Sequence, residues 1–276
     1  MTEEAAVILM RATRHEAEER DAASRFFKVV RLRTEVPPGS LVIGRYANLP
    51  YHGELEADIQ NLGSRLVNST MEHQYIANMD WYWDLSDVTF PTWFRLSDVP
   101  FSERGSALVL KGRTNSRKFE WNQKMFARNF EAASRIAVEL NNDGLIGPQG
   151  VIARKYVPLE TFEHTLTGTP ITNEWRIFYL NGQRLAWGYY WGNIEDLAPV
   201  ERARPAFEKE GLAFADTVAG RIASQVPFFV VDIARTQEGQ WLVVELNDGC
   251  QAGLNGTIDP ASFYAALSQH LGAPLA

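Results

Sequence analysis

Two apolar runs near the C-terminal end of the sequence are each interrupted by a single acidic residue. The runs are FFVVDIAR (228–235) and WLVVEL (241–246), and a short polar segment with a glycine joins them, so they predict a β-hairpin. In that hairpin Asp232 lies opposite residues 244–245, and therefore beside Glu245. The apolar neighbours of both carboxylates indicate strands that are buried on both faces.

The two carboxylates require a compensating positive charge, because like charges on adjacent strands repel one another. Asn247 follows Glu245 at a spacing of two, so on an extended strand both side chains face the same side. Carboxylate and amide oxygens suit Mg²⁺, which takes hard oxygen ligands and completes its shell with water and phosphate oxygens. We therefore predict that Asp232, Glu245 and Asn247 bind magnesium. The alternative, polar residues on a solvent-exposed edge strand, disagrees with the apolar flanks.

A site for magnesium and phosphates also needs cationic side chains, and two lysines upstream are candidates. Lys111 ends the apolar strand SALVLK, where a lysine would project from a rigid element into a cleft. Lys118 lies in the polar loop 112–120, which also contains two arginines and could close over phosphates. The alternative for Lys111 is a lysine in solvent at the end of a strand. No Walker-type phosphate loop occurs in the sequence.

Two arginines lie within apolar strands, where an unpaired guanidinium is costly. Arg154 lies on VIAR, and Arg176 lies on EWRIF two residues after Glu174. A salt bridge between Glu174 and Arg176, which share a face, is one interpretation. The other is an arginine that faces a phosphate, because a fixed guanidinium fork matches phosphate geometry.

The order of apolar periodicities predicts an α/β fold class with two regions, a small α/β lobe over 1–100 and a second region over 101–276. Asn181-Gly182 between two alternating runs predicts a further hairpin. The other expected elements are strands at 5–10, 26–32, 41–46, 106–111 and 151–159, and helices at about 14–26, 53–67, 121–140, 200–225 and 260–271.

Composition narrows the class of protein and of partner. The net charge of −7 and the pI near 5.4 do not favour nucleic acid or an anionic membrane as a partner. A single cysteine excludes an intramolecular disulfide and a cysteine-rich zinc site. The apolar run 5–10 is too short for a signal peptide, and no run approaches a membrane span, so we expect a cytoplasmic protein. Oligomeric state is not predicted.

The combination of these segments resembles the ATP-grasp superfamily. More narrowly, it is similar to the divergent clade that contains the eukaryotic translation-initiation-factor assembly protein and its bacterial relatives. The resemblance spans about residues 107–250 and implies an ATP-grasp fold with the nucleotide bound between lobes. It is carried by the stretches ALVLKGRTNSRKFEW, VIARKYVPL, NEWRIFYLNGQRLAWGYYW and FFVVDIARTQEGQWLVVELNDG.

The resemblance implies a role for each candidate residue. Lys111 would contact the α- and β-phosphates of ATP, with Lys118 in the loop that closes over them. Arg154 and Arg176 would flank the phosphates or an acyl-phosphate. The backbone of the hinge Lys155-Tyr156-Val157 would bind adenine. The metal ligands would be Asp232, Glu245 and Asn247, and Glu160 is a guess for the ribose partner.

The resemblance further implies a magnesium- and ATP-dependent ligase. A carboxylate substrate would attack the γ-phosphate, and an amine would displace phosphate from the resulting acyl-phosphate, with Lys111, Arg154 and Arg176 as catalytic residues. The acceptor could be a small molecule, a peptide or a protein. Two alternatives remain open, an ATP-binding assembly protein without turnover and a kinase.

The remaining reactive side chains are weaker candidates. Cys250 follows Asn247 closely and could lie near the site, but magnesium and arginine already provide an activation route without a thiol. The histidines show no metal-ligand spacing, and we interpret them as surface or structural residues. They are His15, His52, His73, His164 and His270.

Overall fold

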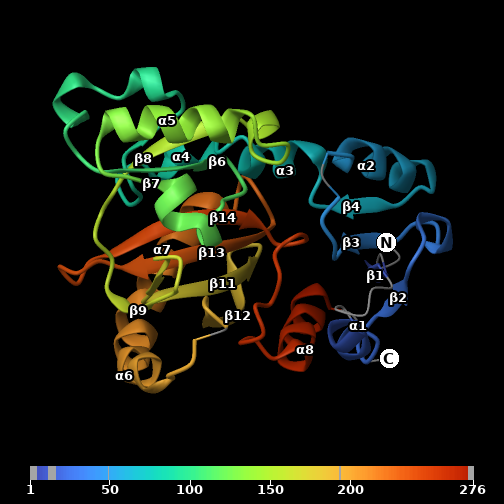
Figure 1. The fold of residues 1–276 in the computed structure, drawn as a ribbon. Helices are drawn as coiled ribbons and strands as arrows, with labels where there is room; N and C mark the ends of the chain where they lie inside the picture. The colour runs from blue at the N-terminus through green and yellow to red at the C-terminus, as the bar shows by residue number, and fades with distance from the viewer. Residues whose placement is uncertain (1–4, 12–16, 49, 193, 273–276) are drawn as a thin grey trace.

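The computed structural model describes residues 5–11, 17–48, 50–192 and 194–272 (Figure 1). Within these ranges three four-stranded sheets and one two-stranded sheet form, together with helices. Figure 1 shows the N-terminal sheet to one side of a large antiparallel sheet, while a small antiparallel sheet lies above the large one. The predicted α/β fold class is confirmed.

The N-terminal sheet is entirely parallel, in the order β2-β1-β3-β4. Its strands are short and mostly apolar, as is typical of parallel strands with covered faces. The elements are β1 (Ala6–Leu9), α1 (Ala17–Ala23), β2 (Lys28–Val30), β3 (Leu41–Gly44), α2 (His52–Asn61) and β4 (Arg65–Val67).

Two helix predictions in this lobe need comment. The helix predicted over 53–67 is wrong in its second half, because Gly63 adopts a φ of 67° and the residues that follow pair with β3 as strand β4. A left-handed glycine is a common helix stop. Of the helix predicted over 14–26, residues 12–16 lie outside the described part of the chain, and α1 falls within the remainder.

The small antiparallel sheet has the order β5-β8-β6-β7, and α5 packs on it through buried aliphatic side chains. Helices α3 and α4 precede it and pack toward the large sheet. The elements are α3 (Thr70–Ala77), α4 (Trp81–Leu85), β5 (Thr92–Trp93), β6 (Leu108–Gly112), β7 (Phe126–Ala127), α5 (Phe130–Asn141) and β8 (Val151–Lys155).

The long helix predicted over 121–140 is interrupted. Residues Trp121–Met125 form a single π-helical turn, and β7 then pairs with β6. Helix α5 begins only after Asn129, whose side chain accepts a hydrogen bond from the Ala132 N–H at 3.0 Å. An asparagine N-cap marks the start of a new helix, and apolar spacing alone did not reveal this break.

The large antiparallel sheet, in the order β12-β11-β13-β14, carries both predicted hairpins. Asn181 and Gly182 have φ values of 50° and 77°, as the predicted turn requires. The elements are β9 (Thr161–His164), β10 (Pro170–Thr172), β11 (Glu174–Leu180), β12 (Gln183–Tyr189), α6 (Ala198–Ala206), α7 (Leu212–Ile222), β13 (Phe228–Arg235), β14 (Trp241–Asp248) and α8 (Pro260–Leu271).

Both faces of the large sheet are buried. Phe228 and Phe229 are successive on β13, so they face opposite sides, and each is 0% exposed. Phe229 packs in the cluster that includes α4 and α7, whereas Phe228 packs with α8 and the N-terminal sheet. No helix in the described ranges is both long enough and apolar enough to cross a membrane.

Candidate functional site

A cleft between the small and large antiparallel sheets holds most of the candidate residues. It encloses about 910 Å³ of empty space, including the solvent at its mouth. Its lining includes Lys111, Lys118, Arg154, Lys155, Tyr156, Val157 and Glu245. The other three candidates, Arg176, Asp232 and Asn247, lie next to Glu245 and contact one another.

The acidic hairpin brings its three oxygen-bearing side chains together. Asp232 and Glu245 are register partners on β13 and β14, as the position of the turn predicts. The Asn247 Nδ2 lies 2.9 Å from Asp232 Oδ2 and 3.3 Å from Glu245 Oε1. The side chains therefore converge on one point, and the donor set fits a hard divalent cation such as Mg²⁺.

Two cationic side chains already balance these carboxylates. Arg176 donates two hydrogen bonds to Asp232, at 2.9 and 2.7 Å, and the Lys111 ammonium lies 2.5 Å from Glu245 Oε2. The salt bridge considered between Arg176 and Glu174 does not form, since Arg176 is the register partner of Asp232. Glu174 accepts a hydrogen bond from the hydroxyl of Thr172 instead.

Burial and charge set the ionisation of the pair of carboxyls. Burial opposes ionisation of Glu245, but the ammonium of Lys111 outweighs it and lowers the pKa of this carboxyl to about 2. Burial also raises the pKa of Asp232. The two short hydrogen bonds from Arg176 favour the carboxylate form, and we assign this pair as ionised.

Arg154 is held in the cleft by uncharged oxygens. It donates to Thr89 Oγ1 at 2.8 Å, to Thr92 Oγ1 at 3.2 Å and to the Val244 carbonyl at 2.6 Å. Burial lowers the pKa of Arg154 to about 10, so the guanidinium remains charged at neutral pH. Its positive charge is therefore fixed in position beside Glu245 without a direct ion pair in the described residues.

Lys118 projects into the cleft against two aromatic rings. Its ammonium lies 2.9 Å from the Tyr190 hydroxyl, 4.5 Å from the Tyr190 ring centroid and 5.0 Å from that of Trp191. Burial lowers the pKa of Lys118. The two arginines of the same loop point elsewhere: Arg117 pairs with Asp143, and Arg113 lies over Phe94.

The family of the chain is decided by comparison with known proteins. The model of an ATP-grasp domain family, described as family 3 of its clade within the ATP-grasp domains, matches residues 103–267, more than half of the 276 residues. The chain belongs to this family. The predicted resemblance to the ATP-grasp superfamily and to a divergent clade within it is confirmed.

Solved structures share the ATP-grasp fold over almost the whole chain. D-cycloserine synthetase DcsG is 14% identical with a TM-score of 0.56, covering 96% of this chain and 99% of that chain. A RimK domain ATP-grasp protein from Sphaerobacter thermophilus DSM 20745 is 15% identical, with a TM-score of 0.55 and coverage of 96% and 98%. The ATP-grasp ligase PsnB, complexed with precursor peptide PsnA2 and AMPPNP, is 11% identical, with a TM-score of 0.57 and coverage of 99% and 98%. No curated protein matches the sequence.

The hinge of this ATP-grasp domain has one open backbone donor. Lys155 and Tyr156 use their backbone N–H groups on the carbonyls of Pro91, at 2.8 Å, and Ala107, at 2.9 Å. Among the hydrogen bonds of the described residues, none comes from the Val157 N–H. A base in the cleft could therefore receive a hydrogen bond from Val157, but not from the other two hinge amides.

Several cleft residues escaped the sequence analysis. Tyr190 and Trp191 line the cleft at the end of β12, and Glu174 lines it from β11. The run YYW at the end of a hairpin was the available signal, but aromatic residues there are usual in a core. Glu160, the guess for ribose, does not line the cleft; it accepts a hydrogen bond from Asn173 and lies 3.5 Å from Arg235.

Cys250 and two of the histidines are buried away from this cleft. Cys250 is 3% exposed, its thiol donates to the Val67 carbonyl at 2.7 Å, and burial raises the pKa of the thiol. A nucleophilic cysteine needs the opposite environment. His52 and His73 are 4% and 5% exposed and stack on each other, a grouping that their sequence spacing did not reveal. His15 lies outside the described residues.

Glu174 gives a test of the electrostatics of the cleft. Burial, together with the charge of Asp232, raises the pKa of Glu174 from 4.5 to about 8. The folded state therefore keeps a proton that the unfolded state releases, so the wild type loses stability as pH rises from about 4.5 to 8. We expect Glu174→Gln to escape this loss and to gain roughly 4 kcal/mol relative to wild type over that interval.

Urea unfolding of both proteins at pH 5 and pH 8, without nucleotide or divalent cations, measures this difference. Glu208→Gln, which changes an exposed carboxylate, is the matched control and should follow the wild type. A constant difference between Glu174→Gln and wild type at both pH values would show that Glu174 is ionised throughout.

Proposed function

We propose that this protein is a magnesium- and ATP-dependent ligase that joins a carboxylate to an amine through an acyl-phosphate and releases ADP and phosphate. The observation that carries the proposal is the grouping of Asp232, Glu245 and Asn247 beside buried cations in the cleft of an ATP-grasp domain.

The two ends of the cleft differ in chemistry, and this difference supports an orientation for ATP. The end near the hinge is apolar and aromatic, with Trp121, Met125 and Tyr156 in its lining. The base would lie there and accept a hydrogen bond from the Val157 N–H. The opposite end carries Lys111 and the acidic cluster, where the phosphates would lie.

The acidic cluster suits magnesium because it offers carboxylate and amide oxygens with little else to satisfy them than two cations. Asp232, Glu245 and Asn247 would hold the ion, which would neutralise phosphate charge and orient the phosphates for transfer. Lys111, which now pairs with Glu245, would turn to the phosphates, and Arg154 would keep its fixed charge beside them. Lys118 would cover them from the loop.

Arg176 connects the acidic cluster to a second cavity, and this supports a place for the acceptors. Its Nη1 donates to the Gly253 carbonyl and to Asn255 Oδ1, both at 3.1 Å. Gly253 and Asn255 line a cavity of about 1480 Å³, which Arg45 and Tyr46 also border. A carboxylate bound there would approach the γ-phosphate past Arg176, whose guanidinium fork would stabilise the transferring group.

The test is the nucleotide product. The purified protein is incubated with ATP, Mg²⁺ and pools of amino acids and peptides, and we expect ADP, phosphate and a new amide in equal amounts. Peptides are included because PsnB is solved with a precursor peptide. AMP with pyrophosphate would contradict the acyl-phosphate route. A stable phosphorylated product would instead establish a kinase, and tight ATP binding without ADP an assembly protein.

A further inference from the structure

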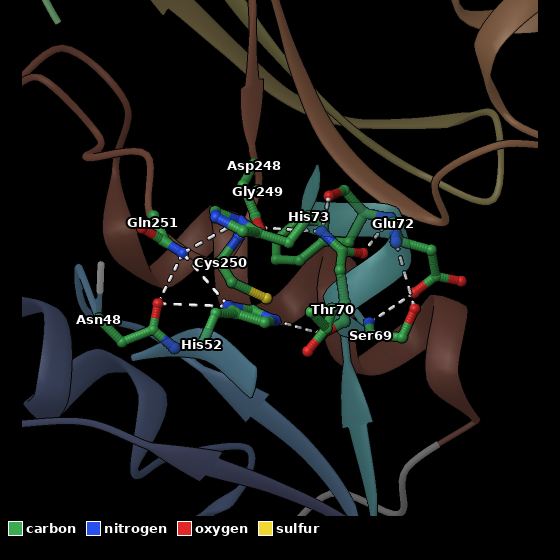
Figure 2. Close-up of polar contacts among 12 residues, drawn as sticks. Asn48, His52, Ser69, Thr70, Glu72, His73, Asp248, Gly249, Cys250 and Gln251 are labelled. Atoms are coloured by element: carbon green, nitrogen blue, oxygen red, sulfur yellow. Dashed lines mark hydrogen bonds and ion pairs between the residues drawn. The ribbon is translucent and has the colours of Figure 1, made fainter. Parts of the chain in front are cut away.

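A second polar cluster lies on the N-terminal side of β14, outside the ATP cleft (Figure 2). It consists of His52 on α2, His73 on α3 and Asp248 at the end of β14, and all three are buried. One ring nitrogen of each histidine and one carboxylate oxygen all lie within 4.8 Å of one another. Three potential metal ligands from three separate elements therefore meet in the interior.

The hydrogen bonds of His52 prepare one ring nitrogen for a ligand. Its Nε2 lies 2.9 Å from the Asn68 carbonyl, which can only accept, so Nε2 carries the proton and Nδ1 has a free lone pair. Metal-binding histidines typically donate their other N–H to a backbone carbonyl or a carboxylate in this way. Burial lowers the pKa of His52, which keeps the ring in the neutral form that binds metals.

His73 completes the pair of rings. Its Nδ1 lies 2.8 Å from Asp248 Oδ2, and its Nε2 is buried without a hydrogen-bond partner in the described structure. The two imidazole rings stack with centroids 4.3 Å apart and planes 8° apart. A buried imidazole nitrogen without a partner is costly, so the cluster lacks a group that would satisfy it.

Gln251 places a fourth polar group at the same point, as Figure 2 shows. Its side-chain amide lies 3.5 Å from His52 Nδ1, 3.3 Å from His73 Nδ1 and 2.7 Å from Asn48 Oδ1. Ligand atoms around a tetrahedral zinc ion lie about 3.3 Å from one another. These spacings match the edges of such a tetrahedron, and rotation of the amide would present its oxygen to the ion.

We propose that His52, His73 and Asp248 bind one divalent transition-metal ion of the zinc class, with Gln251 as the fourth ligand. Imidazole nitrogens favour such ions over Mg²⁺, which prefers oxygen ligands. Binding draws the ligand atoms from within 4.8 Å to about 3.3 Å of one another and turns the two rings toward a common point.

This site is separate from the one proposed for magnesium. Asp248 and Asn247 are successive on β14, so their side chains face opposite sides of the strand. Asn247 contacts Asp232 and Glu245, whereas Asp248 contacts His73 and accepts a hydrogen bond from Asn68 at 2.8 Å. The ion would tie α2 and α3 of the N-terminal region to the strand that carries the acidic cluster.

The experiment titrates the untagged full chain, stripped of metal by a chelator, with Co²⁺ in the presence of excess Mg²⁺. Cobalt reports its ligands through visible absorption, which is intense in a tetrahedral nitrogen–oxygen site and weak in an octahedral oxygen site. We expect one equivalent of Co²⁺ with the intense spectrum, displaced by one equivalent of Zn²⁺. Asp232→Asn should leave this spectrum unchanged, because it alters the other site.

Variants then assign the ligands. His52→Gln and His73→Gln should each lose the intense spectrum, and Zn²⁺ should raise the Tm of the wild type but not of these variants. His164→Gln and His270→Gln change exposed histidines and should behave like the wild type. Retained ATP binding in the His52 and His73 variants would show that they are folded.

The proposal is overturned if the wild type binds no stoichiometric Co²⁺, or if it gives only the weak octahedral spectrum. It is also overturned if the intense spectrum survives in both folded His52 and His73 variants. Should the variants fail to fold, the spectrum of the wild type still decides. Failure of the ligase assay would not affect these results, because they need no turnover.

Discussion

Replacing Asp232 by asparagine is expected to abolish ATP turnover and to lower the free energy of unfolding by about 3–5 kcal/mol. The carboxylate is 0% exposed and accepts two hydrogen bonds from Arg176, which is itself 7% exposed. The neutral amide would leave the buried guanidinium without an anionic partner. It would also remove one of the two carboxylates that we propose as magnesium ligands.

Two measurements separate these effects. Urea unfolding without nucleotide gives the loss of stability, and calorimetric titration with ATP and Mg²⁺ below the unfolding range gives the loss of binding. Glu131→Gln is the matched control, because Glu131 is exposed and pairs only with Arg135 across one helical turn. We expect that change to cost less than about 0.5 kcal/mol. Wild-type affinity of Asp232→Asn for magnesium-ATP would refute the metal assignment.

Lys111→Met is expected to lower the rate of ATP turnover by about 100- to 1000-fold, the loss usual for one preorganised charge at a reacting group. The Lys111 ammonium is also the partner of Glu245, and it holds the pKa of that carboxyl near 2. Methionine keeps most of the side-chain volume, so packing should change little. The principal change is therefore the loss of one positive charge.

The sign of the accompanying pH effect follows from linkage. A carboxyl with a lowered pKa contributes stability above its unfolded value of 4.5, and this contribution disappears as pH falls through about 2. Without Lys111 the contribution of Glu245, roughly 3 kcal/mol at neutral pH, should be absent. The difference in unfolding free energy between wild type and Lys111→Met should thus shrink as pH falls from 4.5 toward 2.

Lys124→Met is the control for the second prediction. Lys124 pairs with Glu120 across one turn at 2.7 Å, and both side chains are partly exposed, so the pair contributes little. Turnover close to that of the wild type is expected for this variant. Equal loss of activity in Lys111→Met and Lys124→Met would mean that general charge, and not the position of Lys111, is responsible.

Much of the fold followed from local patterns. The turn at Asn181-Gly182 and the alternation around it predicted β11 and β12, and the second hairpin was predicted with Asp232 beside Glu245. Hairpins are readable because the turn type and the two-residue period fix the register over a few residues. Helix boundaries were less readable: the break before Asn129 depends on pairing between β7 and β6, which apolar spacing does not encode.

The partners of the charged residues were not readable in the same way. Arg176 has a carboxylate two residues away on its own strand, yet it pairs with Asp232, 56 residues later. That choice depends on β13 lying beside β11, which brings the two side chains together in register. Neighbours across a sheet come from strand order, and strand order is a property of the whole chain.

By itself the sequence determined the acidic hairpin, the cationic residues upstream and their order along the chain, which together predicted the ATP-grasp family. Only the tertiary structure decided which cation meets which carboxylate, that Val157 is the open hinge donor, and that His52 and His73 meet Asp248. The first group depends on residues close in sequence, whose geometry the backbone fixes locally. The second depends on contacts between elements more than a hundred residues apart, which form only when the sheets and lobes pack.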